Sequence, residues 1–299
     1  MKIAVAGATG RVGHHVFEIL SASDHDVVPI SRAYGVDVIS GQGLAAALAG
    51  VDGVIDVSTG PSPDQQEATE FFATATRNLL KEGEQAGVRR IVVVSIIGVD
   101  RLTGGYNAAK VVHEQAMRSG PIPVSILRAS QFHEFVGQLV EWGTQGDVSY
   151  LPNARFQPVA ARTVAQALVD RATDPDWVPA ADNGPVAEIA GPREESFIDT
   201  AKLLVARRAL PLRIEALSNP AWTDQDTKLM EAGALLPSSH ATLAGPTFQD
   251  WLDATSLPLP CGREDYVALH REATISPTSS PDGLRARTGY EASEPVPSS

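Results

Sequence analysis

Short apolar runs alternate with stretches of helical periodicity along the N-terminal half of the chain. Runs of this kind are typical of parallel strands buried on both faces, and we predict strands over 2–6, 26–30, 51–58, 89–97 and 124–130, with a short extended piece over 35–39. Between them apolar residues recur every three or four positions, which predicts helices over 11–22, 44–50, 64–86 and 107–118. This alternation predicts a Rossmann-type α/β fold, a doubly wound parallel sheet with helices on both faces.

The C-terminal half has a mixed pattern. Helical periodicity covers 163–173 and 196–208, and a strand-like run covers 186–191. Because no linker separates these segments, we expect one domain over 1–257, whose C-terminal segments pack onto the same sheet and bind the substrate. The Ser, Pro and Gly content of 258–299 predicts a largely disordered tail.

Charge and cysteine content narrow the class of protein. The formal net charge is −12 and no run of Lys or Arg forms a basic patch, so nucleic acid is not an expected partner. The single cysteine, Cys261, cannot form an internal disulfide, which is typical of the reducing cytoplasm. No stretch resembles a signal peptide or approaches the roughly 20 apolar residues of a membrane span. We therefore expect a cytoplasmic protein that acts on a small molecule, and its oligomeric state stays open.

Three glycines, Gly7, Gly10 and Gly13, lie between the first predicted strand and the first predicted helix. In a nucleotide-binding loop the first glycine permits a sharp turn, the second lets a pyrophosphate approach the backbone, and the third lets helix and strand pack closely. The amides from about Gly10 to Val12 then face the phosphates. A structural turn without a ligand is the alternative, but the strand–loop–helix context favours nucleotide binding.

The residues after the second predicted strand favour NADPH over NADH. An acidic residue at this point binds the ribose 2′-hydroxyl of NAD, whereas this chain has Ser31 and Arg32. A guanidinium pairs well with a 2′-phosphate, and a hydroxyl can add a hydrogen bond. Arg11, in the glycine loop, is a second cation within reach. The alternative interpretation leaves Arg32 as a solvated loop residue and Arg11 as a helix-surface charge.

The Gly-x-x-Gly-x-x-Gly spacing with its Thr-Gly pair resembles the short-chain dehydrogenase/reductase superfamily, and GATGRVG is similar to its atypical NmrA-like branch. The stretches DVISGQGLAAALAGVDGVIDVS, SILRASQFHEF and FQPVAARTVAQAL support that branch, and the resemblance covers about residues 1–255. It implies that Asp37 and Val38 line the adenine and that Ser58 and Thr59 lie near the nicotinamide-side ribose. The full set of expected cofactor contacts is Gly7, Thr9, Gly10, Arg11, Val12, Gly13, Ser31, Arg32, Asp37, Val38, Ser58, Thr59 and Lys110.

A tyrosine and a lysine with helical spacing follow the strand over 89–97. Tyr106 and Lys110 would share one face of a helix. A phenol is a poor acid–base catalyst at neutral pH, and we expect the ammonium to lower the pKa of Tyr106 and to hold the nicotinamide ribose. Ser95, at the strand end, would hydrogen-bond a substrate carbonyl. The three resemble the Ser–Tyr–Lys arrangement of the superfamily, whose signature is Tyr-x-x-x-Lys; a pocket-lining Tyr106 without proton transfer is the alternative.

Other candidates are weaker. Phe132, His133 and Phe135 follow the strand over 124–130, at the end where ligands bind in parallel sheets, so they either line a substrate pocket or pack in the core. His113 and Glu114 continue the helix of Tyr106 and are expected to face solvent. The sequence contains no metal-ligand spacing, so we expect no metal.

These features predict an NADPH-dependent oxidoreductase that reduces a small carbonyl or quinone compound. Tyr106 would protonate the developing oxyanion, Ser95 would orient it and Lys110 would tune Tyr106. The alternative is a non-catalytic NADP(H)-sensing regulator, because many NmrA-like proteins keep the lysine without the tyrosine. An epimerase or dehydratase is a third and less favoured class.

Overall fold

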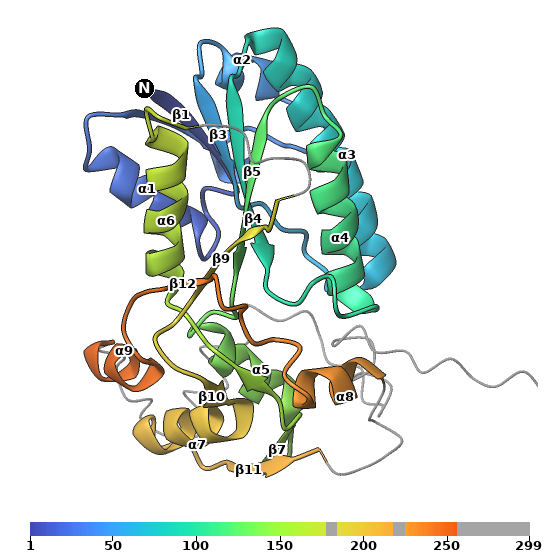
Figure 1. Cartoon of the computed structure of the whole chain (residues 1–299), viewed down its shortest axis with the longest axis vertical. Helices are drawn as coiled ribbons and strands as arrows, with labels where there is room; N and C mark the ends of the chain where they lie inside the picture. Colours follow the sequence, from blue (N-terminus) through green and yellow to red (C-terminus); the bar gives the residue numbers. More distant parts are fainter. Residues whose placement is uncertain (178–183, 218–224, 256–299) are drawn as a thin grey trace, which may run out of the picture.

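The computed structural model describes residues 1–177, 184–217 and 225–255, and its centre is a seven-stranded parallel sheet (Figure 1). Across the sheet the strands are β12 (Thr242–Leu243), β9 (Ala187–Ala190), β5 (Val124–Ala129), β4 (Arg90–Ile96), β3 (Gly53–Asp56), β1 (Lys2–Ala6) and β2 (Asp26–Ile30). Because β1 pairs with both β2 and β3, the crossovers reverse direction there, and the carboxyl ends of β1 and β3 form the topological switch point. The predicted fold class is confirmed. The predicted tail over 258–299, with Cys261, lies outside the described residues.

Helices cover both faces of this sheet, as Figure 1 shows. One face is covered by α1 (Gly13–Ser21) and α6 (Ala161–Thr173), and the other by α2 (Leu44–Leu48), α3 (Gln65–Ala86) and α4 (Gly105–Arg118). The central strands β1, β3, β4 and β5 are therefore largely buried on both sides, which is why they appear in the sequence as continuous apolar runs without alternation.

Two hydrophobic clusters fill the space between the sheet and its helices. Successive residues of β1 point to opposite faces, so Ile3 joins the cluster under α1 and α6 while Ala4 joins the cluster under α2, α3 and α4. Val16 of α1 and Leu48 of α2 are fully buried in these two clusters. The apolar stripes of the predicted helices thus face the sheet on both sides.

A third hydrophobic cluster lies among the elements beyond the carboxyl ends of the strands, and Figure 1 shows these elements in its lower part. It is surrounded by α5 (Phe135–Gly143), β6 (Thr144–Gln145), β7 (Val148–Leu151), β8 (Arg155–Phe156), β10 (Glu195–Ser196), α7 (Phe197–Arg207), β11 (Arg213–Ala216), α8 (Gln225–Glu231) and α9 (Phe248–Ala254). In this group β6, β7 and β11 form one small sheet, and β8 pairs with β10. Of the C-terminal elements, which we expected to pack onto the central sheet, only α6, β9 and β12 of the described residues do so. The remaining described C-terminal elements surround a core of their own.

The segment 35–39, which we predicted to be extended, forms no strand. It follows the 3-10 helix η1 (Arg32–Tyr34). The carboxylate of Asp37 accepts hydrogen bonds from the backbone amides of Ile39 and Ser40 at 3.0 and 3.4 Å, and this closes a turn. The prediction is wrong because the local side-chain hydrogen bonds of an aspartate outweigh the β-propensity of its valine neighbours.

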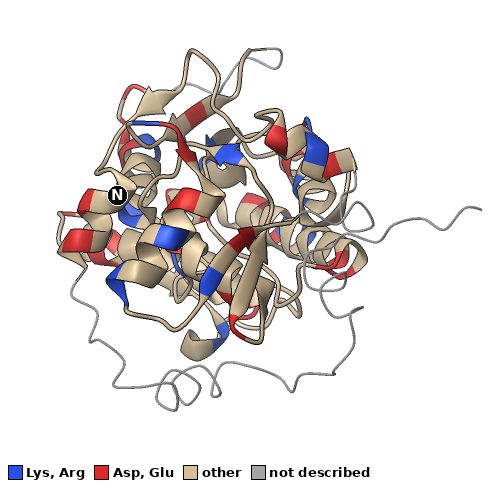
Figure 2. Ribbon diagram, turned by 90° about the horizontal axis from the view of Figure 1, so that it is seen from below, with Lys and Arg blue, Asp and Glu red and all other residues tan. Residues whose placement is uncertain are grey.

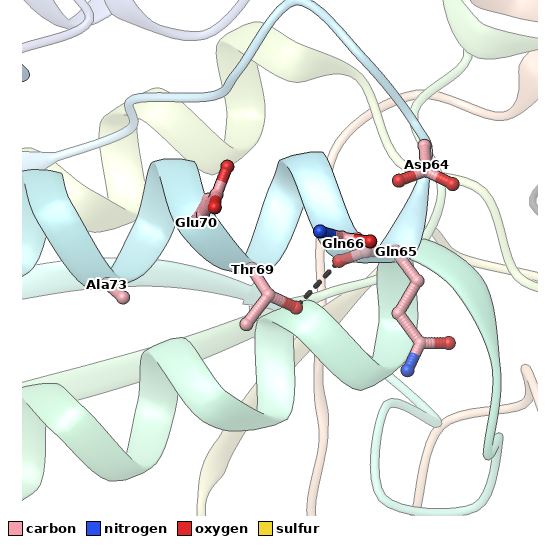
Figure 3. Close-up of a pocket in the computed structure, with 6 residues that line it drawn as sticks. All are labelled: Asp64, Gln65, Gln66, Thr69, Glu70 and Ala73. Atoms are coloured by element: carbon pink, nitrogen blue, oxygen red, sulfur yellow. Dashed lines mark hydrogen bonds between the residues drawn. The ribbon is translucent and has the colours of Figure 1, made fainter.

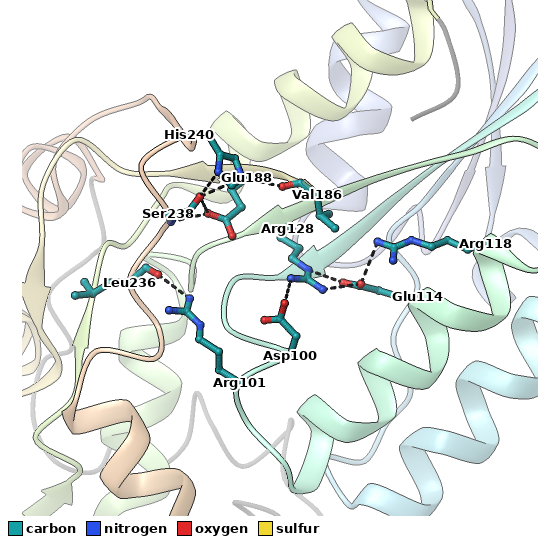
Figure 4. A network of polar contacts seen from close by, with 10 residues as sticks. All are labelled: Asp100, Arg101, Glu114, Arg118, Arg128, Val186, Glu188, Leu236, Ser238 and His240. Carbon is teal, nitrogen blue, oxygen red and sulfur yellow. Dashed lines mark hydrogen bonds and ion pairs between the residues drawn. The ribbon is translucent and has the colours of Figure 1, made fainter. Parts of the chain in front are cut away.

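An ion network joins buried Glu114 of α4 and buried Arg128 of β5 to the exposed Asp100 in the loop after β4 (Figure 4). Arg128 donates from Nε and Nη2 to the two carboxylate oxygens of Glu114, both at 2.9 Å, and from Nη1 to Asp100 at 2.6 Å. Glu114 is 3% exposed, so the expectation that it faces solvent is wrong. In the same view, Ser238 donates from its amide and hydroxyl to Glu188 at 2.7 and 2.6 Å, which ties the segment before β12 to β9.

Charged residues of both signs occur side by side along the described ribbon in the view from below. Lys and Arg positions are interspersed with Asp and Glu positions over the described residues (Figure 2). Within the described part of the chain, no helix combines the length and the apolar character needed to cross a membrane.

Candidate cofactor and catalytic site

The glycine loop connects β1 to α1 at the topological switch point. Gly7 has a φ of +83°, and a Cβ on it would lie 2.8 Å from the Cα of Ser58. A Cβ on Gly13 would overlap the carbonyl oxygen of Gly7. The backbone therefore requires glycine at both positions, because the loop passes directly over the end of β3 while the first turn of α1 rests on the loop.

Gly13→Ala is expected to lower the free energy of unfolding by about 1–3 kcal/mol, because the added methyl group must push α1 away from the loop. Gly137→Ala is the matched control within α5, since a Cβ there would meet its nearest neighbours at 3.7 and 3.8 Å, an ordinary contact distance. Urea denaturation measures both. Equal stability of Gly13→Ala and the wild type would contradict the close packing of this loop.

The backbone amides of the loop divide into paired and available groups. The amide of Gly10 donates to the carbonyl of Gly7 at 2.9 Å, so the expectation that it faces a phosphate is wrong. Among the described residues, no acceptor pairs with the amides of Thr9, Arg11 and Val12. Unpaired amides at a helix N-terminus are the usual donors to a pyrophosphate, so this loop fits the group.

The end of β2 carries the residues that we expect near the 2′-position of the ribose. The hydroxyl of Ser31 is buried and has no partner among the described residues. Because buried hydroxyls are normally hydrogen-bonded, an unpaired one here fits a partner supplied by a ligand. Arg32 is exposed, whereas Arg11 donates to Gln138 of α5 at 3.4 Å, and burial lowers the pKa of Arg11.

The loop expected to line the adenine is held from α3. Asn78 donates from Nδ2 to the carbonyl of Val38 at 2.9 Å and to that of Ile39 at 2.8 Å. Ser40 also donates its hydroxyl to the carboxylate of Asp37 at 2.9 Å, which completes the turn. The sequence analysis missed Asn78, because nothing in a single sequence indicates that an asparagine within a helix reaches a distant loop.

Tyr106 lies in the first turn of α4, and its hydroxyl is 2.8 Å from the hydroxyl of Thr59, just after β3. Its ring packs edge-on against Phe72 of α3, with the ring centroids 5.7 Å apart. Burial and the negative charge of Asp56 raise the pKa of Tyr106, although the hydrogen bond with Thr59 opposes them. The phenol therefore carries its proton at neutral pH. Ser95, at the end of β4, is 3% exposed, and its hydroxyl has no partner among the described residues.

Lys110 points from α4 toward the sheet. Its ammonium donates to the carbonyl of Val94 at 2.9 Å and lies 2.9 Å from Nδ1 of His113. Burial lowers the pKa of Lys110 to about 8, against the raising effect of Asp56 and Glu114. The expectation that Lys110 lowers the pKa of Tyr106 is wrong for this structure, because the ammonium is directed at β4 and His113 while burial dominates the phenol.

His113 and Asp56 are further polar residues of this site that the sequence analysis missed. Nε2 of His113 lies 3.3 Å from Oδ2 of Asp56, and each side chain is 2% exposed, so the expectation that His113 faces solvent is wrong. Asp56 also accepts from the amide and hydroxyl of Ser58 at 2.9 and 2.6 Å. One signal was present in the sequence: a carboxylate inside an apolar strand run needs a buried partner.

The aromatic candidates after β5 differ in their surroundings. Phe132 packs against the cluster under α1 and α6. His133 is 1% exposed, its Nε2 lies 3.2 Å from the carbonyl of Pro246, and its ring contacts Trp251 of α9. Burial lowers the pKa of His133 to about 4, so the ring is neutral at pH 7. Of the two interpretations, packing fits Phe132 and His133, while half-buried Phe135 stays a candidate for contact with a substrate.

A separate shallow pocket lies on the first turns of α3 (Figure 3). It is lined by Asp64, Gln65, Gln66, Thr69, Glu70 and Ala73. It shares no residue with the glycine-loop site, and its two carboxylates would repel phosphate groups.

A doubly wound parallel sheet with a glycine loop at its switch point defines a Rossmann-type nucleotide-binding protein. Residues 7–175, more than half of the chain, match the family described as NAD(P)H-binding, and the chain belongs to that family. The predicted membership of an NAD(P)-binding family is thereby confirmed.

Individual relatives are distant. Photosystem II assembly factor Ycf39 from Synechocystis sp. is 26% identical over 111 residues, which are 32% of this chain and 34% of that protein, so the match spans about a third of that relative. The NADP complex of dTDP-4-dehydrorhamnose reductase from Bacillus anthracis aligns with a TM-score of 0.61 at 16% identity, over 84% of this chain and 97% of that one. The NADPH complex of the NADPH-dependent quinone oxidoreductase QOR2 from Escherichia coli aligns with a TM-score of 0.59 at 20% identity, over 84% and 98%. At these identities the two structures support the shared fold alone.

Proposed function

We propose that the protein is an NADPH-dependent reductase of a small carbonyl or quinone compound. The observation that carries this proposal is the position of Tyr106, a protonated phenol bonded to Thr59 at the switch-point end of the sheet. A phenol that carries its proton is in the form that a proton donor requires, so Tyr106 can act as the general acid when a carbonyl is reduced.

Different segments of the chain would hold the pyrophosphate, the adenine and the nicotinamide-side ribose of the cofactor. The pyrophosphate would lie on the amides of Thr9, Arg11 and Val12, on the loop that Gly7 and Gly13 allow to pack closely against β3 and α1. The adenine would lie against the loop of Asp37 and Val38 that Asn78 fixes. Ser58, Thr59 and Lys110 would contact the nicotinamide-side ribose.

The preference for NADPH is part of the proposal. Arg32 is exposed at the end of β2, and the unpaired hydroxyl of Ser31 lies beside it in the chain. A guanidinium and a hydroxyl together suit a 2′-phosphate, and no carboxylate stands at this position to pair with a 2′-hydroxyl.

In the proposed reaction, a bound reduced nicotinamide supplies the hydride equivalent. Tyr106 transfers the proton of its hydroxyl to the substrate oxygen, and the resulting phenolate is reprotonated from solvent, so that the carbonyl gains one hydride and one proton. Ser95 supplies a second hydrogen bond to the same oxygen, which gives its buried hydroxyl the partner that it lacks. Thr59 holds the phenol in place. A quinone is a chemically equivalent acceptor, and an NADPH-dependent quinone oxidoreductase is among the proteins that share this fold.

Arg32→Ala is expected to weaken NADPH binding about tenfold or more and to leave NADH binding almost unchanged, because a hydrogen bond to a charged group contributes about 1.5–3 kcal/mol. Fluorescence titration with both nucleotides measures the two affinities. Arg89→Ala is the matched control, since Arg89 is exposed just before β4, at the opposite end of the sheet. An equal loss of NADPH and NADH affinity would rule out the 2′-phosphate role.

The proposed function is tested by NADPH oxidation with a panel of small aldehydes, ketones and quinones. The proposal predicts turnover with at least one member and a much lower rate with NADH. Tight NADPH binding with no turnover on any member would favour the NADP(H)-sensing regulator instead. Absence of binding of either nucleotide would reject both functions.

A further inference from the structure

A chain of buried polar groups runs from the end of β3 to the middle of α4. Oδ2 of Asp56 lies 3.3 Å from Nε2 of His113, and Nδ1 of the same ring lies 2.9 Å from the ammonium of Lys110. Phe72 of α3 covers the chain: its ring stacks on His113 with centroids 4.5 Å apart, and its centroid lies 4.6 Å from the ammonium. All four side chains are shielded from water, so their mutual contacts decide which of them carry a charge.

The two contacts of His113 fix its tautomer. An ammonium can only donate, so Nδ1 of His113 accepts, and the ring proton must then lie on Nε2, where Asp56 accepts it. Burial and the charge of Lys110 lower the pKa of His113, so the ring is neutral at pH 7. Burial opposes ionisation of Asp56, but its hydrogen bonds with His113 and Ser58 hold its pKa below the usual value, so it is a carboxylate. His113 is thus a neutral bridge between a buried anion and a buried cation.

We propose that Asp56 and His113 are positioning residues that hold the ammonium of Lys110 in place for the cofactor. An ammonium has three N–H groups; Val94 and His113 take two of them, and one stays for a ligand. The inference rests on the proposed function, in which Lys110 contacts the nicotinamide-side ribose. It adds that Asp56 of β3, acting through the imidazole of His113, fixes the direction of the Lys110 side chain and favours its charged form.

The charged groups around Lys110 single out Asp56. Glu114, on the same helix, also favours the charged lysine, but both of its oxygens are taken by Arg128 of β5, which in turn contacts Asp100. Tyr106, one turn earlier, is neutral at pH 7. Asp56 is therefore the carboxylate whose removal most directly reduces support for the ammonium. Without its charge the ammonium loses its proton at a lower pH.

The tautomer is tested by nitrogen NMR of the imidazole in the nucleotide-free protein. In the wild type we expect His113 to carry its proton on Nε2 and a bare Nδ1 at neutral pH. Asp56→Asn should reverse this pattern: the carboxamide oxygen stays with the two donors of Ser58, so the amide N–H group faces Nε2 and moves the ring proton to Nδ1. Asp52→Asn, the same change just before β3, should leave the pattern unchanged. A wild-type ring protonated on Nδ1, or on both nitrogens, would overturn the proposal without any variant.

The link to the cofactor is tested by NADPH affinity as a function of pH, followed by fluorescence. The wild type should lose affinity as pH rises through about 8, where Lys110 loses its charge, and Asp56→Asn should lose it about one pH unit lower. The same midpoint in both proteins would overturn the positioning role. If the wild type binds no nucleotide at any pH, the proposed function fails, and the NMR result alone then decides whether the Asp56–His113 pair directs Lys110.

Discussion

Arg128→Met is expected to lower the free energy of unfolding by about 3–5 kcal/mol. The substitution leaves Glu114, which is 3% exposed, without the two hydrogen bonds that compensate its burial. Arg118 reaches Glu114 at 3.4 Å from an exposed position and cannot replace both bonds. Urea denaturation followed by circular dichroism measures the loss.

Two further variants separate the mechanism from a general loss of packing. Arg118→Ala should change stability by less than about 1 kcal/mol, because Arg118 is itself exposed and Glu114 keeps both of its hydrogen bonds from Arg128. Arg128→Met combined with Glu114→Met should be more stable than Arg128→Met alone, since no uncompensated carboxylate stays buried. If the double variant is the less stable of the two, the cost comes from lost packing and the electrostatic explanation is wrong.

Tyr106→Phe is expected to lower turnover by about 10²-fold or more while NADPH affinity changes little. The substitution keeps the ring against Phe72 and removes the proton that the proposed reaction needs. The phenol is bonded to Thr59 and is not proposed as a main cofactor contact, so binding should persist. Steady-state kinetics with a substrate found in the NADPH panel and a fluorescence titration give the two numbers.

Lys110→Met provides the comparison for Tyr106→Phe, because it should reduce both turnover and NADPH affinity. A Tyr106→Phe protein that reduces the substrate as fast as the wild type would show that the phenol is not the proton donor. His133 is then a poor replacement, because burial lowers its pKa to about 4 and its Nε2 lies at the carbonyl of Pro246. Solvent would be the remaining source of the proton.

The parts of the fold that depend on local signals were predictable from the sequence. The helix expected over 64–86 is observed as Gln65–Ala86, because Asp64 caps its first turn by accepting from the amide of Glu67 at 2.9 Å and Gly87 ends it in the left-handed conformation. The glycine loop was also predictable, because the spacing of its glycines is a local signal. Its backbone geometry allows no other residue at Gly7 or Gly13.

Contacts between distant segments were not predictable. The segment 135–143 was not expected to be helical; it is short and contains Gly137, and its stability comes from packing in the third cluster. The charge pattern of α4 suggested exposed polar residues. His113 and Glu114 point inward instead, because each pairs with a buried side chain of the sheet: His113 with Asp56 of β3 and Glu114 with Arg128 of β5. A single sequence shows each of these residues but not which of them are in contact. The environment of Lys110 depends on those contacts.

The most direct test of the account is a crystal structure of the protein with bound NADPH. The account predicts that the pyrophosphate lies on the amides of Thr9, Arg11 and Val12, that the 2′-phosphate contacts Arg32, and that the nicotinamide ring faces the hydroxyl of Tyr106. A nucleotide bound elsewhere on the chain, or a nicotinamide turned away from Tyr106, would contradict it.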